Sequence, residues 1–180
     1  MVPEAPLEPT DEGLVPKGEG WFVLNAKDAR WYHADGRSSF CEFEGETDFP
    51  QLGFNVSVLN PGEPMSMYHW EADQEDFLVL SGEALLLVEG EERPLRAWDF
   101  VHCPPETKHV IVGAGDGPCV VLAVGARERS VGRPDWGGYS VDETALRRGA
   151  GVEEETSDPA VAYARFERRR PTAYRPEWLG

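Results

Sequence analysis

The sequence is poor in basic residues and contains no long hydrophobic run. Lys and Arg together number 17 against 33 for Asp and Glu, so the formal net charge is −16 over 180 residues. Such an acidic chain repels phosphate backbones and anionic lipids, and we therefore expect neither a nucleic acid nor a membrane as its partner. No apolar stretch approaches the roughly 20 residues of a transmembrane helix. Residues 1–20 lack the basic and apolar regions of a signal peptide, which predicts a soluble, cytoplasmic protein.

Cysteine is also scarce. The three cysteines, Cys41, Cys103 and Cys119, are odd in number and include no Cys-x-x-Cys pair. This pattern excludes a disulfide framework and a zinc finger, and it is typical of a reducing compartment. The glycine-rich loops that bind phosphate and the Gly-x-Ser-x-Gly turn of serine hydrolases are missing as well, so neither chemistry is indicated.

The sequence does contain many short β-rich runs separated by Gly, Pro and Asn turns. This arrangement is typical of an antiparallel sandwich or barrel, and we predict an all-β domain over residues 21–126. Residues 1–20, rich in Pro, Glu and Gly, are expected to form a flexible N-terminal tail. The expected strands are Trp21–Leu24, Phe54–Leu59, Phe77–Leu80, Ala84–Val88, Phe100–Cys103, Val110–Val112 and Val120–Val124.

Residues 127–180 have few apolar side chains and are expected to form a partly helical extension. We expect this extension to pack on the barrel or on a partner subunit, because exposed sheet edges need cover, and we predict a homodimer. The expected helices are a short one through Leu146, after the capping-box pattern Ser140 to Glu143, and a second over Ala160–Arg168, after Asp158-Pro159.

A group of arginines lies near the end of this extension. We interpret it as a solvated face, balanced by the three glutamates of residues 153–155; recognition of an anionic ligand is the alternative. The members are Arg165, Arg168, Arg169 and Arg170.

Two histidines and two glutamates have the chemistry of a metal site. His69 and Glu71, separated by one residue, would share one face of a strand. Glu75 is expected to begin the next strand on a face of packing residues, where a buried carboxylate needs a partner. His109 follows a Pro-Pro turn at the start of a later strand. Imidazole and carboxylate donors suit Zn, Mn, Fe or Ni, so these four residues are candidate ligands of a divalent metal.

The spacing of these residues resembles the first motif of the cupin superfamily. That motif has a glycine, a His-x-His pair, a glutamate and a second glycine, and Gly62, His69, Glu75 and Gly82 take these places here. Six residues separate Glu75 from Gly82, as they do in the family.

The second cupin motif is present in part. It ends on a Pro-x-Gly turn followed by a histidine, and Pro104 and His109 match two of these positions. The resemblance implies a double-stranded β-helix, or jelly-roll, barrel. It also implies a metal held inside the barrel, with the family's three-His, one-Glu set changed to His69, Glu71, Glu75 and His109.

The chain departs from the family pattern at several positions. Glu71 stands where the motif has its second histidine, which makes the site harder and shifts its preference towards Mn or Fe(II) over Cu. Trp98 and Glu106 stand where the second motif has glycines, and Trp98 is expected to fill barrel volume. Tyr68 and His102, which flank the motif residues, are candidate pocket residues.

Three functional hypotheses follow. The first is a small metal-binding cupin, extended to a metal-dependent enzyme that acts on a small molecule. The second is a non-catalytic module that binds a sugar or metabolite, since the superfamily includes metal-free members. The third treats His69, Glu71 and His109 as the facial triad of a 2-oxoglutarate oxygenase, with Arg127 as the basic residue for the co-substrate carboxylate.

Overall fold

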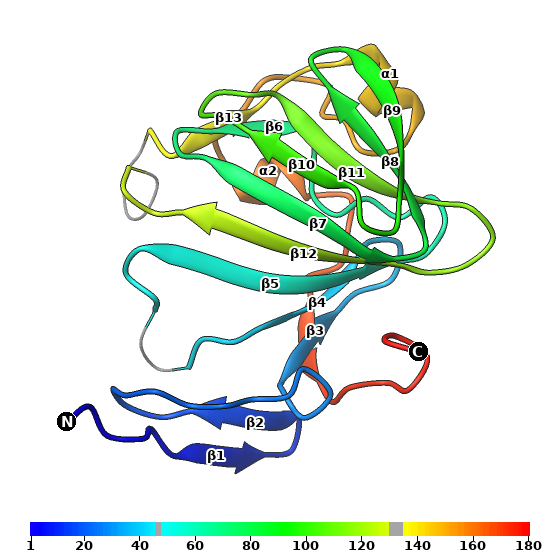
Figure 1. Ribbon diagram of the computed structural model, residues 1–180. Coiled ribbons are helices and arrows are strands. Elements are labelled where there is room, and N and C mark those ends of the chain that lie inside the picture. Colours follow the sequence, from blue (N-terminus) through cyan, green and yellow to red (C-terminus); the bar gives the residue numbers. More distant parts are fainter. Residues whose placement is uncertain (46–47, 130–134) are drawn as a thin grey trace.

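The computed structural model describes residues 1–45, 48–129 and 135–180. Two antiparallel sheets form the barrel (Figure 1). The larger sheet has the order β10-β7-β12-β5-β4-β3-β14. Its strands are β3 (Trp31–His33), β4 (Ser39–Glu42), β5 (Leu52–Leu59), β7 (Glu75–Ser81), β10 (Phe100–Cys103), β12 (Cys119–Ala126) and β14 (Arg170–Thr172).

The smaller sheet has the order β13-β6-β11-β8-β9. Its strands are β6 (His69–Glu71), β8 (Glu83–Val88), β9 (Glu91–Arg96), β11 (His109–Ala114) and β13 (Gly137–Tyr139). Every inner strand run expected from the sequence between residues 54 and 124 is present. The predicted all-β jelly roll with a small helical extension is therefore confirmed.

The main core lies between the two sheets. Because side chains alternate along a strand, every second residue of β12 enters this core: Cys119, Val121 and Ala123. The facing sheet contributes apolar side chains such as Leu86 and Ile111.

The outer face of each sheet is covered as well. On the larger sheet, Val120 of β12 joins a second cluster with Trp31 and Trp178, so the C-terminal end of the chain covers this face. The rings of Trp31 and Trp178 lie 4.8 Å apart. On the smaller sheet, Leu87 and Val110 pack under the segment that carries α1 (Glu143–Arg147). Residues on both faces of these strands are therefore buried.

The C-terminal segment is tied to its own barrel by backbone pairing. Strand β14 adds to the edge of the larger sheet beside β3, and β13 adds to the smaller sheet beside β6. Figure 1 shows α1 at the top of the molecule next to β9.

The two helices are shorter than the sequence suggested, and one begins elsewhere. Asp142, and not Ser140, caps α1, because its carboxylate accepts a hydrogen bond from the backbone N–H of Ala145 at 2.8 Å. Asp158 caps α2 (Pro159–Ala162) as expected, but the helix ends at Ala162. Beyond it, Tyr163 turns inward to pack in a cluster of aromatic and apolar residues, which overrides the helical tendency.

Some strands were not expected from the sequence. The run of β9 is highly charged and contains Pro94, features that typify an edge strand. The N-terminal residues, expected as a flexible tail, form a hairpin of β1 (Leu7–Thr10) and β2 (Gly13–Pro16). The expected strand Trp21–Leu24 is reduced to a single bridge between Glu4 and Trp21.

The two positions that depart from the motif glycines keep a glycine-like backbone. Trp98 has φ of 75° and Glu106 has φ of 70°, both in the left-handed region that costs an ordinary residue roughly 1 kcal/mol or more. The expectation that Trp98 fills barrel volume is wrong, since its side chain is 74% exposed. Within the described ranges, no helix is long and apolar enough to cross a membrane.

We predict that Trp178→Ala lowers the free energy of unfolding by about 3 kcal/mol, because it opens a cavity over Trp31 on the outer face of the larger sheet. Urea unfolding followed by tryptophan fluorescence measures this change. The matched control is Trp21→Ala, which removes a half-exposed ring and is expected to stay within about 0.5 kcal/mol of the parent. Equal losses for both variants would contradict the packing role of the C-terminal segment.

Candidate metal centre

Three of the four candidate ligands begin strands at one end of the barrel. His69 begins β6, Glu75 begins β7 and His109 begins β11. His109 pairs directly with His69 across the smaller sheet, and their ring centroids lie 4.9 Å apart. Glu75 reaches the same point from the opposite sheet. One ligand atom from each of the three residues lies within 4.8 Å of the others.

Backbone hydrogen bonds fix the orientation of both imidazoles. His69 Nδ1 lies 2.8 Å from the carbonyl of Met67, and His109 Nδ1 lies 3.0 Å from the carbonyl of Thr107. A carbonyl oxygen only accepts, so Nδ1 carries the proton in each ring. The unprotonated Nε2 atoms then face the site, as in histidines that ligate metals.

The Glu75 carboxylate lies between the two rings. Its Oε2 is 3.5 Å from His69 Nε2 and 3.4 Å from His109 Nε2. Glu75 Oε2 and His109 Nε2 are both buried, and neither has a hydrogen-bond partner among the described residues. Leaving buried polar atoms unpaired costs about 1–3 kcal/mol each. A cation at their common point would satisfy both atoms, so the donor set fits a divalent metal.

The electrostatics of the cluster favour an ionised Glu75 and a neutral His109. Burial acts to lower the pKa of His69, but Glu75 and then Glu71 raise it above its ordinary value, so a metal would compete with a proton for this ring. Burial acts to raise the pKa of Glu75, but the adjacent His69 and then the charge of His109 bring that pKa below its ordinary value. Burial and the nearby His69 lower the pKa of His109. An ionised carboxylate beside a neutral imidazole is the form in which these residues act as ligands.

Glu71 lies beside the cluster and outside its tight centre. It shares a face of β6 with His69, as the spacing predicted, and its Oε1 is 3.8 Å from His69 Nε2. Burial, and then the charge of Glu75, raise the pKa of Glu71 to about 7. Its side chain is 25% exposed, so it lies on the more open side of the site.

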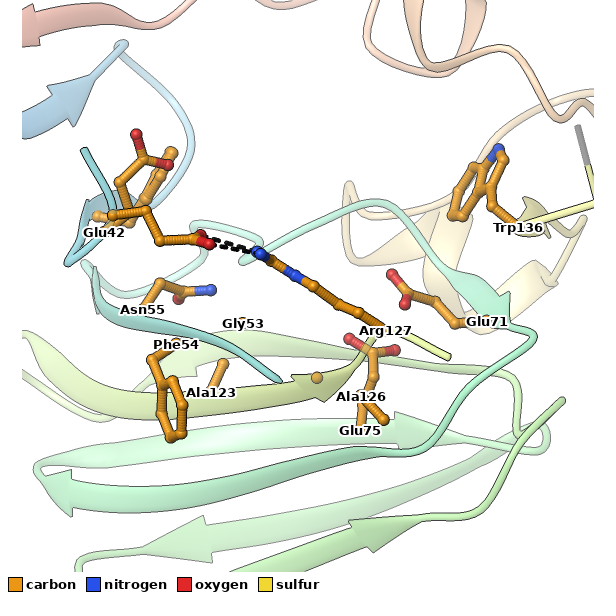
Figure 2. Close-up of a pocket in the computed structure, with 13 residues that line it drawn as sticks. Glu42, Gly53, Phe54, Asn55, Glu71, Glu75, Ala123, Ala126, Arg127 and Trp136 are labelled. Carbon is orange, nitrogen blue, oxygen red and sulfur yellow. Dashed lines mark hydrogen bonds and ion pairs between the residues drawn. The ribbon is translucent and has the colours of Figure 1, made fainter. Parts of the chain in front are cut away.

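Two adjoining cavities lie over the cluster. The inner one, of about 240 Å³, contains the metal-site candidates, and the outer one measures about 370 Å³. Figure 2 shows the outer cavity, with Glu71 and Glu75 pointing into it. The residues that line both cavities are Phe40, Asn55, Glu71, Glu75, Ala123 and Trp136.

Arg127 lines the outer cavity but is already paired. Its Nη2 lies 2.8 Å from Glu44 Oε2, its Nη1 contacts Glu44 Oε1, and Nη1 also donates to the carbonyl of Phe49 at 2.9 Å. The guanidinium is therefore engaged on two sides. This arrangement does not favour the co-substrate role that the 2-oxoglutarate hypothesis gives to Arg127.

The two candidate pocket residues lie elsewhere. Tyr68 is buried under the α1 segment, where its hydroxyl accepts a hydrogen bond from the Gly90 N–H at 3.3 Å. His102 is on the exposed face of β10, where its Nδ1 lies 2.7 Å from Asp76 Oδ1. Neither residue lines the inner or the outer cavity.

Sequence reasoning missed several cavity residues that come from the C-terminal extension. Arg169, interpreted as part of a solvated face, lines the inner cavity, whereas Arg168 and Arg170 are exposed. Its local sequence gives no signal, because the three consecutive arginines are equivalent until the chain is folded. The aromatic residues that line the inner cavity from the same segment are Trp136, Tyr139 and Tyr163.

Comparison with known proteins agrees with this fold. The Cupin domain family matches residues 55–125, and no curated protein matches the chain. A predicted oxalate decarboxylase from Thermotoga maritima is 19% identical, with a TM-score of 0.52 over 58% of this chain and 97% of that one. The polyketide cyclase RemF from Streptomyces resistomycificus is 14% identical, with a TM-score of 0.50 over 59% of this chain and 79% of that one.

A sugar phosphate isomerase from Silicibacter pomeroyi is 28% identical over 57% of this chain, with a TM-score of 0.45. This chain covers 62% of that isomerase, and it covers 51% of a protein from Acidithiobacillus ferrooxidans to which the same activity is provisionally assigned. The match to the family and the shared barrel confirm the resemblance seen in the sequence. Residues 55–125 form a cupin domain.

Proposed function

We propose that this chain is a metal-dependent cupin enzyme that acts on a small molecule. The observation that supports the proposal most directly is the pair of buried, unpartnered atoms, Glu75 Oε2 and His109 Nε2, which lie 3.4 Å apart beside His69. With these three residues as ligands, Glu71 is the fourth donor, on the side of the site that faces the outer cavity.

The donor set indicates which metals fit. Two imidazoles and two carboxylates are borderline to hard donors, which suit Mn, Fe(II), Ni or Zn better than Cu(I). When bound, such an ion supplies a Lewis-acid charge that polarises an oxygen of the substrate. The protein's own contribution is to orient both histidines through the carbonyls of Met67 and Thr107 and to surround the inner cavity with aromatic walls that limit water.

The enzyme hypothesis is preferred to a non-catalytic binding module because the candidate ligands border the inner cavity, which leaves room for a substrate. A purely structural metal site is closed by protein ligands on all sides, whereas a catalytic site keeps a position free for substrate. Here the inner cavity borders all of His69, Glu71, Glu75 and His109.

We further propose a reducing, cytoplasmic setting. All three cysteines are free and buried, and burial raises the pKa of Cys41 and Cys103 to about 12, which keeps both thiols protonated and unreactive.

We also propose a homodimer, with its contact at the β10 edge of the larger sheet. Trp98 and Phe100 are 74% and 64% exposed at this edge, and large exposed aromatic side chains on an edge strand are typical of a covered surface. The C-terminal extension is less suited to reach a partner, because β14 and Trp178 pack on their own barrel.

The metal proposal predicts that purified protein holds roughly one divalent ion per chain and that His69→Ala, His109→Ala and Glu75→Gln each lose it. Elemental mass spectrometry measures the metal. His102→Ala is the matched control, because His102 is an exposed histidine outside both cavities and the metal is expected to stay. Added Mn²⁺ should also raise the melting temperature of the parent and leave the three variants unchanged. A parent that takes up none of Mn, Fe, Ni or Zn would refute the metal site.

Glu71→Gln is expected to weaken metal binding by about tenfold without abolishing it, since the more exposed donor can be replaced by water. Titration of metal-free protein with Mn²⁺ in a calorimeter gives the two dissociation constants. Affinity within twofold of the parent would show that Glu71 does not act as a donor.

The dimer proposal predicts a particle of twice the 20.0 kDa chain mass in size-exclusion chromatography with light scattering. Phe100→Glu is expected to yield monomers, because it buries a charge in the contact. Val161→Glu, which places the same charge on an exposed residue of α2, is expected to remain dimeric. A parent particle of 20.0 kDa excludes the dimer.

A further inference from the structure

Arg169 presents a positive charge to the inner cavity. It lies between α2 and β14, and its guanidinium is held by neutral groups only. Its Nε donates to the carbonyl of Ser38 at 3.0 Å, and its Nη2 donates to Ser38 Oγ at 2.6 Å and to the carbonyl of Met65 at 3.3 Å. The ring of Phe40 lies 4.8 Å from Cζ. Within the described chain Nη1 makes no hydrogen bond, which leaves it for a ligand.

No carboxylate of the described residues forms an ion pair with Arg169, although the charge of Glu63 acts on it from a greater distance. Among the described residues, no carboxylate oxygen lies within 4.0 Å of the Arg169 nitrogens. A second arginine, Arg37, is only 8% exposed nearby, with its Nε unpartnered and its Cζ 4.0 Å from the ring of Tyr163. Burial, and then the charge of Arg37, lower the pKa of Arg169 to about 9, so the guanidinium is still protonated at neutral pH.

A cation that is withdrawn from solvent without an ion-pair partner is costly, and two such cations, buried Arg37 and partly buried Arg169, lie close to each other here. Neither makes an essential structural ion pair in the described residues. Arg169 lines the inner cavity and Arg37 lies close to Arg169. An anion that enters the cavity would explain why two positive charges are placed there.

The balance of charge in the cavity points in the same direction. When both carboxylates are ionised, as metal ligands are, Glu71 and Glu75 contribute two negative charges to its lining and Arg169 one positive charge. A divalent ion would bring the lining to +1. An anion that carries one negative charge then makes the enclosed site neutral, which is the favourable state in a low-dielectric interior.

We propose that Arg169 binds the carboxylate of a small organic acid, which is the substrate class of this site. The inference rests on the proposed metal site for its charge balance. A carboxylate suits the single free nitrogen of Arg169, because Nη1 can donate a charge-assisted N–H···O bond to one carboxylate oxygen. A phosphate group carries more charge than a carboxylate and usually accepts hydrogen bonds from several N–H donors. Such donors are scarce here, because the other walls of the inner cavity are mostly aromatic: Phe40, Phe77, Trp136, Tyr139 and Tyr163. The inner volume of about 240 Å³ limits the acid to a few carbon atoms.

The test is calorimetric titration of the full-length protein with acetate, lactate, pyruvate and inorganic phosphate at constant ionic strength. Each probe is titrated into Mn²⁺-loaded protein and into EDTA-treated protein. The parent is expected to bind at least one carboxylate, and Arg169→Gln is expected to weaken that binding by about tenfold or more. Arg168→Gln removes an exposed neighbouring charge and is expected to stay within twofold of the parent.

Two further measurements keep the outcomes distinct. Arg169→Lys keeps the positive charge but not the guanidinium, so it carries the test if Arg169→Gln does not fold. Its affinity for the carboxylate is expected to lie between those of the parent and Arg169→Gln. Metal content is determined for each variant. Unchanged metal with lost carboxylate binding supports the inference. Unchanged metal with unchanged carboxylate binding, tighter binding of phosphate, or no carboxylate binding by the parent overturns it.

The metal proposal and the carboxylate proposal can be refuted independently. Carboxylate binding is expected to be weaker in EDTA-treated protein than in Mn²⁺-loaded protein, and weaker still in EDTA-treated Arg169→Gln. If the parent takes up no metal, the metal-dependent function is wrong, and the titration of EDTA-treated protein then decides the role of Arg169. Carboxylate affinity that is the same in the parent and in Arg169→Gln under that condition overturns the inference.

Discussion

Strand β12 carries apolar side chains on both of its faces, and this double burial constrains the rest of the molecule. One face, with Cys119, Val121 and Ala123, needs the smaller sheet opposite it. The other face, with Val120 and Leu122, needs cover from outside the barrel. The chain supplies this cover with its own C-terminal end. The extension is therefore part of the fold and cannot be treated as an appendage to a finished barrel.

The same requirement brings the extension to the candidate site. Strand β13 is paired with β6 and β14 with β3, and parts of the segment that these two strands bound reach the inner cavity. Tyr139, Tyr163 and Arg169 then line the inner cavity. The chemistry of the site is thus shared between two parts of the chain: the cupin motifs provide the metal-ligand candidates, and the extension provides the aromatic walls and the cation.

The departures from the family motifs separate into two kinds. Trp98 and Glu106 change the residue but keep a left-handed backbone, so the turns retain their shape at some cost in strain. At Gly82 the glycine is retained, because a Cβ there would lie 2.5 Å from the carbonyl oxygen of Pro118. Glu71, in contrast, changes the chemistry. It replaces an imidazole with a carboxylate on the open side of the cluster, and it thereby alters the charge that any bound ligand meets.

The sequence by itself determined the jelly-roll class, most inner strands and the residues of the cluster. These depend on local rules: the two-residue period of strands, turn residues at fixed places, and motif spacing that places His69, Glu75 and His109 at strand starts. The N-cap of α1 could not be predicted from the sequence, because Ser140 and Asp142 are both residue types that cap helices. The structure decides between them, since the backbone N–H of Ser140 donates to the carbonyl of Tyr68. Edge strands such as β9 were missed, because a charged run with a proline looks like a loop.

Only the tertiary structure decided which exposed-looking residues face the cavity. The sequence does not distinguish Arg169 from its neighbours Arg168 and Arg170, but only Arg169 lines the inner cavity. Likewise, the sequence does not show that Arg127 is paired with Glu44. Tyr68 and His102 adjoin the motifs but point away from both cavities. A side chain's environment depends on contacts between segments far apart in the sequence, and local pattern contains no information about those contacts.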